Sequence, residues 1–364
     1  MDVIALVLLA KRRGASDLHL SVGSPSMLRL HGELVPAEND VLLTAQDMEE
    51  AFAQLTSDVE RAKFKKEREL DFGFSVQNLV RIRCNAAWQR GTISLALRLI
   101  ANIIPNIDTL NIPRLCKDLI LKPRGLLVVS GPTGSGKSTS LAAMIDYLNN
   151  TARRRVVTIE DPIEYIYTSH KCNITQRELG DDTHSFAEAL RHVLRQDPDV
   201  ILVGEMRDLE TASAALTIAE TGHLVLTTGH APSTYQAVER IIDMFPPDER
   251  QLAQTRLASL LIGIMCQALV PKTDGHGRAP AVEIMLANSA VRNLIREGKI
   301  HQLPNAIRTH AKLGMQLLDQ ALVALHRNGV ISRDNVYAYC NDHDEVEKLI
   351  ASADDRDPVV ADLR

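Results

Sequence analysis

The pattern of apolar and polar residues divides the chain into two parts, and the first part extends to about residue 100. Alternating segments in it predict strands at 16–20, 27–36, 70–76, 80–87 and 93–100, with Gly32 at the turn of a hairpin. Helices are predicted at 44–55 and 58–69, and the apolar run Val3–Ala10 predicts a first helix. Basic residues follow this run instead of preceding it, which is the reverse of a secretory signal. We therefore expect a compact α+β domain over residues 1–100.

From residue 125 onward the pattern is different. Apolar strands predicted at 125–130, 155–161, 200–205 and 223–228 alternate with helices predicted from 138 and at 185–196, 208–220 and 233–244. This alternation predicts an α/β domain with a mostly parallel sheet that is covered on both faces. Residues 248–339 are expected to be mainly helical and to pack beside that sheet. Pro105 and Pro113 suit a linker at 101–115, so the main domain is expected to cover 116–340.

Composition and charge narrow the class of protein. The net charge is −5, and residues 342–364, with eight acidic and three basic residues, account for all of it. The acidic tail 341–364 is expected to be partly disordered, and the neutral body argues against a nucleic-acid partner. The longest later apolar stretch, Leu257–Val270, is shorter than the ~20 residues that span a bilayer, so no membrane span is expected. Five cysteines without a C-x-x-C pair indicate reduced cytosolic thiols.

A glycine-rich segment after the first strand of the main domain carries the clearest chemistry. It reads GPTGSGKST and lies between a predicted strand and a predicted helix, which is the context of a P-loop. In a P-loop, backbone N–H groups curl around phosphates, the lysine reaches the β and γ phosphates, and the following hydroxyl joins the Mg²⁺ shell. The segment therefore predicts a nucleoside triphosphate site made by Gly131, Pro132, Thr133, Gly134, Ser135, Gly136, Lys137, Ser138 and Thr139.

Hydrolysis of a triphosphate requires a carboxylate that positions or deprotonates water. Glu205 follows an apolar strand, at the place where P-loop enzymes hold acidic residues, and is our candidate general base. Gly204 stands before it, where an ordinary strand of this kind would carry a metal-binding Asp. The segment TIEDPIEY at 158–165 offers Glu164 as a residue that approaches the metal or its water. The alternative for this segment is that Asp161 caps a helix.

Two histidines and two arginines complete the candidate residues. His223 and His230 stand at the two ends of one predicted strand, roughly 20 Å apart, so one metal ion cannot bind both. The carboxyl end of the strand places His230 on the nucleotide side, and His223 is then a structural or inter-subunit residue. Arg81 and Arg83 alternate on a strand and share a face. They either complete the site of a neighbouring subunit or form a solvated, ion-paired surface.

Together these motifs resemble those of the secretion and pilus ATPases, and within them the PilT-type retraction ATPases of type IV pili. The resemblance rests on GASDLHLSVG (14–23), GPTGSGKST, TIEDPIEY, RQDPDVILVGEMRD (195–208) and TGHLVLTTGH (221–230). Near the C-terminus, AVRNLIREGKIHQLPNAIRT (290–309) and GMQLLDQAL (314–322) are similar to signatures of the retraction subgroup. The combined match covers nearly the whole chain and is far more specific than a P-loop alone.

The resemblance implies a RecA-like ATPase domain preceded by a PAS-like domain, with ATP and Mg²⁺ bound. It implies Glu205 as general base, Glu164 as its helper, and Glu164 with Ser138 near the metal. It places His230 in the nucleotide site and Arg81 and Arg83 as contacts from the N-terminal domain. It further implies a homohexameric ring in the cytoplasm, at the inner-membrane base of the pilus. There the ring would act on a platform protein and could work beside related pilus ATPases.

Several alternatives stay open within this resemblance. An accessory retraction ATPase would carry the same motifs. A pilus-assembly or type II secretion ATPase would carry a longer N-terminal region and a four-cysteine zinc element, and a nucleic-acid motor would show a basic channel. The chain also departs from its relatives at Thr228–Ala231, where TGHA replaces a typical T-L-H-T. Gly229 and Ala231 thus remove bulk and a hydroxyl from the surroundings of His230.

Overall fold

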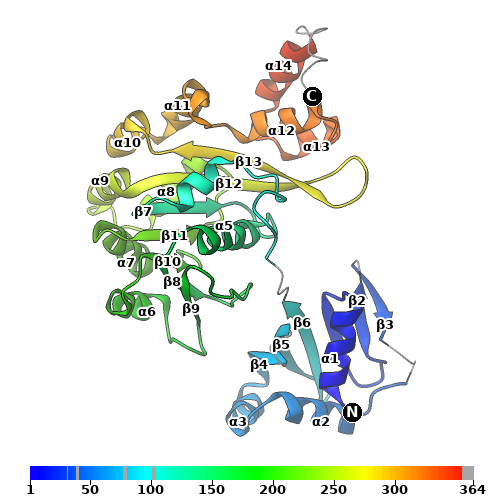
Figure 1. Cartoon of the computed structure of the whole chain (residues 1–364). Coiled ribbons are helices and arrows are strands. Elements are labelled where there is room, and N and C mark those ends of the chain that lie inside the picture. Colours follow the sequence, from blue (N-terminus) through cyan, green and yellow to red (C-terminus); the bar gives the residue numbers. More distant parts are fainter. Residues whose placement is uncertain (31, 38–40, 77–79, 101–103, 355–364) are drawn as a thin grey trace. The chain divides into compact units, whose positions relative to one another are not determined.

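The computed structural model describes residues 1–30, 32–37, 41–76, 80–100 and 104–354 (Figure 1). The chain forms two compact units. The first is Met1–Ile103 with the short segment Glu164–Ile166, and the second is Ile104–Ile163 with Tyr167–Arg364. The division falls inside the segment expected to be a linker, 101–115, of which residues 101–103 lie outside the described residues.

The first unit is an antiparallel sheet with three helices, so the expected α+β class is confirmed. The strand order is β3-β2-β1-β6-β5-β4. Helices α2 and α3 begin at capping boxes, in which Thr44 pairs with Asp47 and Ser57 pairs with Glu60. The strands are β1 (Asp17–Leu20), β2 (Met27–Leu30), β3 (Glu33–Pro36), β4 (Glu69–Val76), β5 (Val80–Gln89) and β6 (Thr92–Ile100), and the helices are α1 (Val3–Arg12), α2 (Ala45–Leu55) and α3 (Asp58–Glu67).

The second unit is built on a seven-stranded sheet in the order β13-β12-β7-β11-β10-β8-β9. All neighbouring strands are parallel except β12 and β13, which confirms the expected mostly parallel α/β sheet. Strand β7, which leads into the P-loop, is central and buried along its whole length. The strands are β7 (Gly125–Ser130), β8 (Arg155–Glu160), β9 (Asn173–Glu178), β10 (Val200–Val203), β11 (Leu224–Thr228), β12 (Leu261–Pro271) and β13 (Arg278–Leu286).

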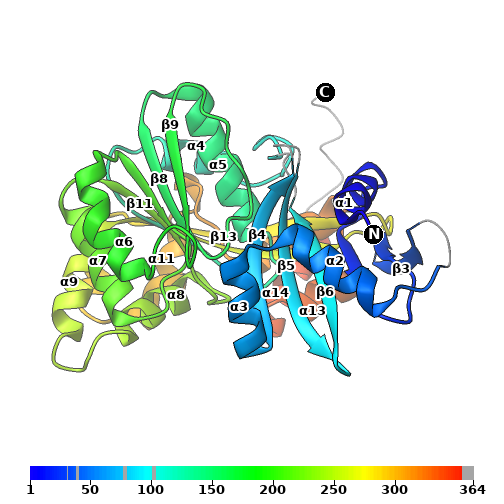
Figure 2. The ribbon, with the colours of Figure 1, turned by 90° about the horizontal axis from the view of Figure 1, so that it is seen from below.

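Helices cover both faces of this sheet because successive side chains of each strand point to opposite faces. In β7, Leu127 and Val129 pack with α4 and α5, whereas Leu126 and Val128 pack with α6 through α11. Figure 2 shows α5 on one side of the strands and α6, α7 and α9 on the other. The bounds are α4 (Leu115–Ile120), α5 (Lys137–Thr151), α6 (Phe186–Val193), α7 (Leu209–Glu220), α8 (Thr234–Asp243), α9 (Arg250–Leu260), α10 (Ser289–Arg296) and α11 (Leu303–Thr309), with short 3₁₀ turns at Leu194–Gln196, Ile300–Gln302 and Ala311–Leu313.

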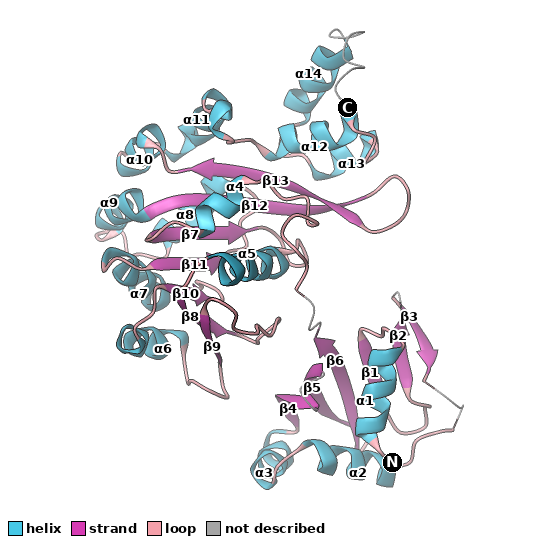
Figure 3. Cartoon of the chain, viewed as in Figure 1, coloured by secondary structure: helices cyan, strands magenta, loops and turns pink. Residues whose placement is uncertain are grey.

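The expectation that residues 248–339 are mainly helical was right for the helices in this range but missed two strands. Strands β12 and β13 lie within this range and extend the sheet, with β12 parallel to β7 (Figure 3). The apolar run Leu257–Val270 carries no clear alternation because β12 is buried on both faces. A strand buried in this way cannot be told from a buried helix by periodicity. Strand β9, with the polar sequence NITQRE, was missed as well.

Three further helices form a small core of their own against the ends of β12 and β13. They are α12 (Leu318–Arg327), α13 (Arg333–Tyr339) and α14 (His343–Asp354), and they pack on Val270, Ala279 and Ala281. Helix α14 occupies the first half of the acidic tail that was expected to be partly disordered, and residues 355–364 of that tail lie outside the described residues. In the part of the chain that the structure describes, no helix has the length and apolarity that a membrane crossing requires.

Candidate active site

The P-loop runs from the end of β7 to the first residue of α5, and two of its glycines have no room for a side chain. Gly131 has a φ of +139°, and a Cβ there would lie 2.3 Å from the carbonyl oxygen of Gln267. Gly136 has a φ of +88°, and its Cβ would lie 2.8 Å from Nε2 of the same glutamine. The loop therefore lies directly on β12, and only glycine permits this backbone path.

Gln267 is a site residue that the sequence reasoning did not single out. It is buried on β12, and its Oε1 accepts a hydrogen bond of 2.7 Å from the hydroxyl of Ser140 in α5. Its amide thus connects the P-loop to the first turn of the helix that follows. The sequence offered one signal for this residue, because Gln267 is a single amide within the apolar run of β12. A buried polar group needs a hydrogen-bond partner, so such an amide indicates a specific contact.

The start of α5 suits the phosphates of a nucleotide. The N-cap residue of this helix, Gly136, makes no side-chain capping bond, and the N-terminus of a helix favours an anion. Lys137 lies within the loop, where its Nζ donates to the carbonyl oxygens of Gly131 (2.8 Å) and Pro132 (3.1 Å). The buried hydroxyl of Ser135 has no hydrogen-bond partner among the described residues. The residues present therefore fit a polyphosphate, and Ser138 is the second residue of the helix beside them.

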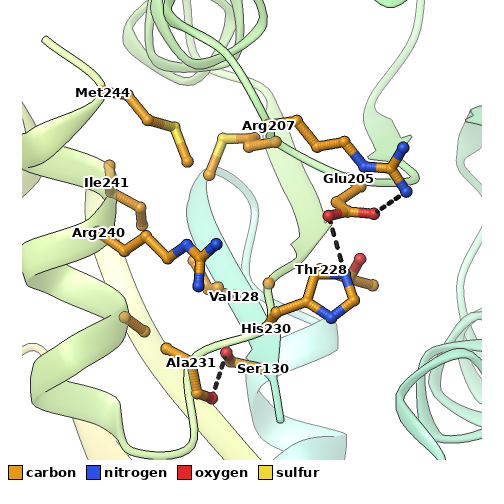
Figure 4. A pocket seen from close by; sticks show the side chains of 13 residues that line it. Val128, Ser130, Glu205, Arg207, Thr228, His230, Ala231, Arg240, Ile241 and Met244 are labelled. Carbon is orange, nitrogen blue, oxygen red and sulfur yellow. Dashed lines mark hydrogen bonds and ion pairs between the residues drawn. The ribbon is translucent and has the colours of Figure 1, made fainter. Parts of the chain in front are cut away.

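Glu205 lies two residues beyond β10 and is held between the side chains of His230 and Arg207 (Figure 4). Its Oε1 is 2.8 Å from Nε2 of His230, and its Oε2 is 2.7 Å from Nη2 of Arg207. Burial alone would raise the pKa of Glu205, but the hydrogen bond from Arg207 and the electrostatic influence of His230 and Arg207 outweigh it and hold that pKa below its ordinary value. Glu205 is therefore a carboxylate at neutral pH.

The structure gives a reason for the glycine that precedes Glu205. The N–H of Gly204 donates to the carbonyl oxygen of Ile159 in β8 at 2.7 Å. A Cβ at Gly204 would lie 3.1 Å from that oxygen and 3.2 Å from the Cα of Glu160. The carbonyl of Gly204 in turn accepts from the hydroxyl of Thr228 in β11. The backbone before Glu205 is thus held by both neighbouring strands, and the close approach leaves no space for the Asp of an ordinary strand of this kind.

His230 follows β11 and His223 precedes it, so the two histidines lie at opposite ends of the strand as expected. The loop after His230 is tied to the base of the P-loop, because the hydroxyl of Ser130 donates to the carbonyl oxygen of Ala231 at 2.7 Å. A Cβ at Gly229 would lie 3.1 Å from the same hydroxyl. Glycine at position 229 therefore leaves room for the Ser130 hydroxyl, whose hydrogen bond fixes this loop.

A pocket of about 520 Å³ opens beside Glu205 and His230. Its floor is apolar, and in Figure 4 the guanidinium of Arg240, from α8, points into it. Arg207 and Arg240 were not singled out from the sequence, although Arg207 stands only two residues after Glu205. The pocket is lined by Val128, Ser130, Glu205, Met206, Arg207, Thr228, Gly229, His230, Ala231, Ala237, Arg240, Ile241 and Met244.

The three acidic residues at the end of β8 and in the loop after it, Glu160, Asp161 and Glu164, have different surroundings. Glu160 is buried and accepts hydrogen bonds from Thr158 Oγ1 (2.6 Å) and Gln176 Nε2 (3.3 Å), so it stabilises the end of the strand. The alternative that Asp161 caps a helix was wrong, because none of the described residues 161–172 is helical. Glu164 is exposed in this loop. Its role beside the metal and the base stays a prediction.

Arg81 and Arg83 lie on β5 in the first unit. The residues between and after them, Ile82 and Cys84, are fully buried, so the two arginines share the opposite face of the sheet, as expected. Arg83 is exposed and Arg81 is half-buried. Their part in the nucleotide site of a neighbouring subunit stays a prediction.

Comparison with known proteins shows the family of this chain. A family model described as "Type II/IV secretion system protein" matches residues 10–356. The chain is 45% identical over 335 residues to the type IV pilus retraction ATPase PilT of Pseudomonas aeruginosa, which covers 92% of this chain and 97% of that protein. It is 38% identical to the type IV pilus ATPase PilU of the same organism, over 98% of this chain and 93% of that one. A crystal structure of the pilus retraction motor PilT with bound ADP is similar with a TM-score of 0.89 and 40% identity, covering 96% of this chain and 99% of that chain. The chain therefore belongs to the family of type II/IV secretion system proteins.

Proposed function

We propose that this chain is an ATPase that drives the retraction of type IV pili. The observation that carries the proposal is the placement of Glu205 between His230 and Arg207, at the carboxyl end of a strand in the same sheet as β7, which leads into the P-loop. A carboxylate in that position is what triphosphate hydrolysis requires. The 45% identity to a retraction ATPase over nearly all of both chains supports pilus retraction as the work that hydrolysis drives.

The proposed reaction begins with the phosphates of ATP on the N–H groups of the P-loop, where Lys137 neutralises the β and γ phosphates. Glu205 then accepts a hydrogen bond from the attacking water and orients it toward the γ-phosphorus. A carboxylate has about four lone-pair positions, so Glu205 can bind this water while it keeps its contacts with His230 and Arg207. His230 stabilises the charge of Glu205 and lies beside the reacting phosphate.

Mg²⁺ fits the donor set that the chain presents, since a hydroxyl and a carboxylate are the oxygen ligands it takes beside substrate phosphates. Ser138 and Glu164 would hold it, and it would neutralise charge on the β and γ phosphates. Within the chain, the hydroxyl of Ser138 stands at the start of α5, and the exposed Glu164 stands in the loop after β8.

The proposal includes an assembly and a location. Six copies form a ring in which Arg81 and Arg83 of one subunit reach the phosphates bound by the next, because guanidinium groups match spread-out phosphate charge. The ring works in the cytoplasm at the inner-membrane base of the pilus, where it acts on a platform protein. Closing and opening of successive interfaces around the ring would transmit the energy of hydrolysis to that protein.

A second candidate is an accessory retraction ATPase that works beside a main motor. Such a protein would carry the same motifs, and this chain is also 38% identical to the type IV pilus ATPase PilU over 98% of its length. A role in type II secretion has less support, since a type II secretion protein E of Pseudomonas aeruginosa matches only 43% of this chain. Removal of the gene separates these candidates. Excess surface pili with lost twitching support the main motor, normal pili with weakened retraction support the accessory one, and cells without pili would refute both.

The enzymatic part is tested with Glu205→Gln, which keeps the volume of the side chain and removes its charge. We expect ATP binding and the oligomeric state to be unchanged and kcat to fall by about 10²–10⁴-fold, the usual contribution of a catalytic base. The matched control is Glu210→Gln, which makes the same change at an exposed residue of α7 that pairs loosely with Arg191 at 3.9 Å. Glu205→Gln with more than a tenth of the wild-type turnover would remove Glu205 from this role.

A further inference from the structure

Glu283, in β13, is a buried carboxylate that holds two helices at once. Its exposed fraction is 1%. Its Oε1 accepts from both the backbone N–H (2.6 Å) and the hydroxyl (2.7 Å) of Thr234, and its Oε2 accepts from the backbone N–H of Leu318 (3.1 Å). Thr234 is the first residue of α8, and Leu318 is the first residue of α12. Each oxygen of Glu283 therefore binds the N-terminus of a different helix.

The two helices belong to different parts of the second unit. Helix α8 begins four residues after His230 and supplies Ala237, Arg240 and Ile241 to the pocket beside Glu205. Helix α12 is the first of the three helices that form the C-terminal core with α13 and α14 (Figure 1). Glu283 is thus placed between the loop that carries His230 and the helices at the C-terminal end of the chain.

The negative charge of Glu283 suits this double contact. The positive ends of two helix dipoles point at it, and each favours a carboxylate over a neutral acid. Burial raises the pKa of Glu283 above its ordinary value, and the hydrogen bonds from Thr234 and Leu318 offset this only in part. A carboxylate makes both contacts with acceptor oxygens alone. A neutral amide of the same size can accept on one side only, because its NH₂ group on the other side would face an N–H donor.

We propose that Glu283 is a positioning residue that couples the nucleotide site to the C-terminal helices. A change at the γ-phosphate that moves His230 also moves the loop 231–233 and the first turn of α8. Because the first turns of α8 and α12 share one carboxylate, α12 follows. This inference rests on the proposed function, since it assumes that ATP binds beside His230, and it adds a route by which the state of that site reaches the end of the chain.

The test compares backbone hydrogen exchange in α12 with and without a non-hydrolysable ATP analogue, and it uses the full chain. In the wild type, the analogue is expected to change exchange at residues 318–322. In Glu283→Gln this change is expected to disappear, with kcat lower by about tenfold and KM within about twofold, since the substitution removes a hydrogen bond to a charged group without touching the nucleotide. Thr234→Val, which removes only the hydroxyl donor, should reduce the change partly.

Asp319→Asn is the matched control. Asp319 is a second buried carboxylate, and it accepts from the backbone N–H groups of Asn341 (2.8 Å) and Asp342 (3.0 Å) within the C-terminal helices. Asp319→Asn should lower the free energy of unfolding but leave kcat and the nucleotide-dependent hydrogen exchange in α12 unchanged. Equal effects of both substitutions, or an unchanged response in Glu283→Gln, would overturn the coupling. A wild type that binds the analogue without any response in α12 would also overturn it. A wild type that does not bind the analogue would instead refute the proposed function.

Discussion

Replacing Gly204 with Ala tests whether the close approach of two strands sets the position of Glu205. The φ of Gly204 is not in the left-handed region, so alanine meets no backbone strain there, and only space decides the outcome. The new Cβ would lie 3.1 Å from the oxygen of Ile159 and 3.2 Å from the Cα of Glu160. Both are backbone atoms of β8, which is hydrogen-bonded on its two sides and cannot easily move away.

Two opposing terms determine how much Gly204→Ala changes the free energy of unfolding. Alanine restricts the unfolded chain and would stabilise the protein by about 0.4–1 kcal/mol where the site can accept it. Forcing a methyl group into a filled site costs about 1–3 kcal/mol, because the neighbours must shift by a few tenths of an ångström. The second term is larger, so we expect the free energy of unfolding to fall by about 1–2 kcal/mol. Each kcal/mol should lower the melting temperature by about 2–4 °C.

The effect on catalysis follows from the same displacement. Glu205 is the next residue, and its contacts of 2.8 Å and 2.7 Å with His230 and Arg207 depend on where its backbone lies. A misplacement of about 1 Å can cost about a hundredfold in rate, so a shift of a few tenths should lower kcat by about three- to tenfold.

The assay pairs thermal denaturation with steady-state ATPase kinetics and uses Gly263→Ala as its control. A Cβ at Gly263 would also meet a backbone oxygen at 3.1 Å, that of Met285, but on β12 and away from Glu205. Both variants should lose similar stability, and only Gly204→Ala should lose kcat. Unchanged stability in both would refute the packing argument. Equal kcat in both would show that the strand contact does not position Glu205.

Two further predictions concern the residues around the site. Arg207→Ala removes the hydrogen bond and charge that keep the pKa of Glu205 low, so the acid limb of the kcat/KM profile should move to higher pH, and an unmoved limb would mean that another group titrates there. The free energy of unfolding should be larger for the wild type than for this variant at pH values above the ordinary carboxyl pKa. This difference should vanish as the pH falls through the pKa of Glu205 in the folded protein. Gln267→Leu leaves the buried hydroxyl of Ser140 without its acceptor and should lower the free energy of unfolding by about 1–3 kcal/mol while it weakens ATP binding. Adding Ser140→Ala should restore much of the stability but not the binding, and fully additive losses in denaturant unfolding would contradict the contact.

The P-loop and the grouping of Glu205 with His230 could be predicted from the sequence for a physical reason. Each strand of the parallel sheet reads as a short apolar run, and the carboxyl ends of such strands meet at one edge. Residues that follow two such runs therefore lie close together, as Glu205 and His230 do. The same reasoning placed His223 at the other end of β11, where its Nδ1 is 2.9 Å from the hydroxyl of Thr221.

The remaining parts depend on contacts that periodicity does not encode. Strand β12 is buried on both faces, so its sequence has no polar side to mark it as a strand. The support that Gln267 gives the P-loop requires that strand to be next to β7, and it was out of reach once the region was interpreted as helical. The pairing of Arg207 with Glu205 depends on the path of a short loop after β10, which neighbouring strands fix from both sides.

The position of β12 also has a consequence for how this protein is made. A ribosome has released the P-loop, Glu205 and His230 once residue 230 is made, yet β7 would then be an edge strand with unpaired backbone groups beside an unsupported P-loop. The strand that completes this edge ends only at Pro271. The nucleotide site is therefore finished late in synthesis, and a shortened chain that stops at residue 230 should aggregate when expressed alone.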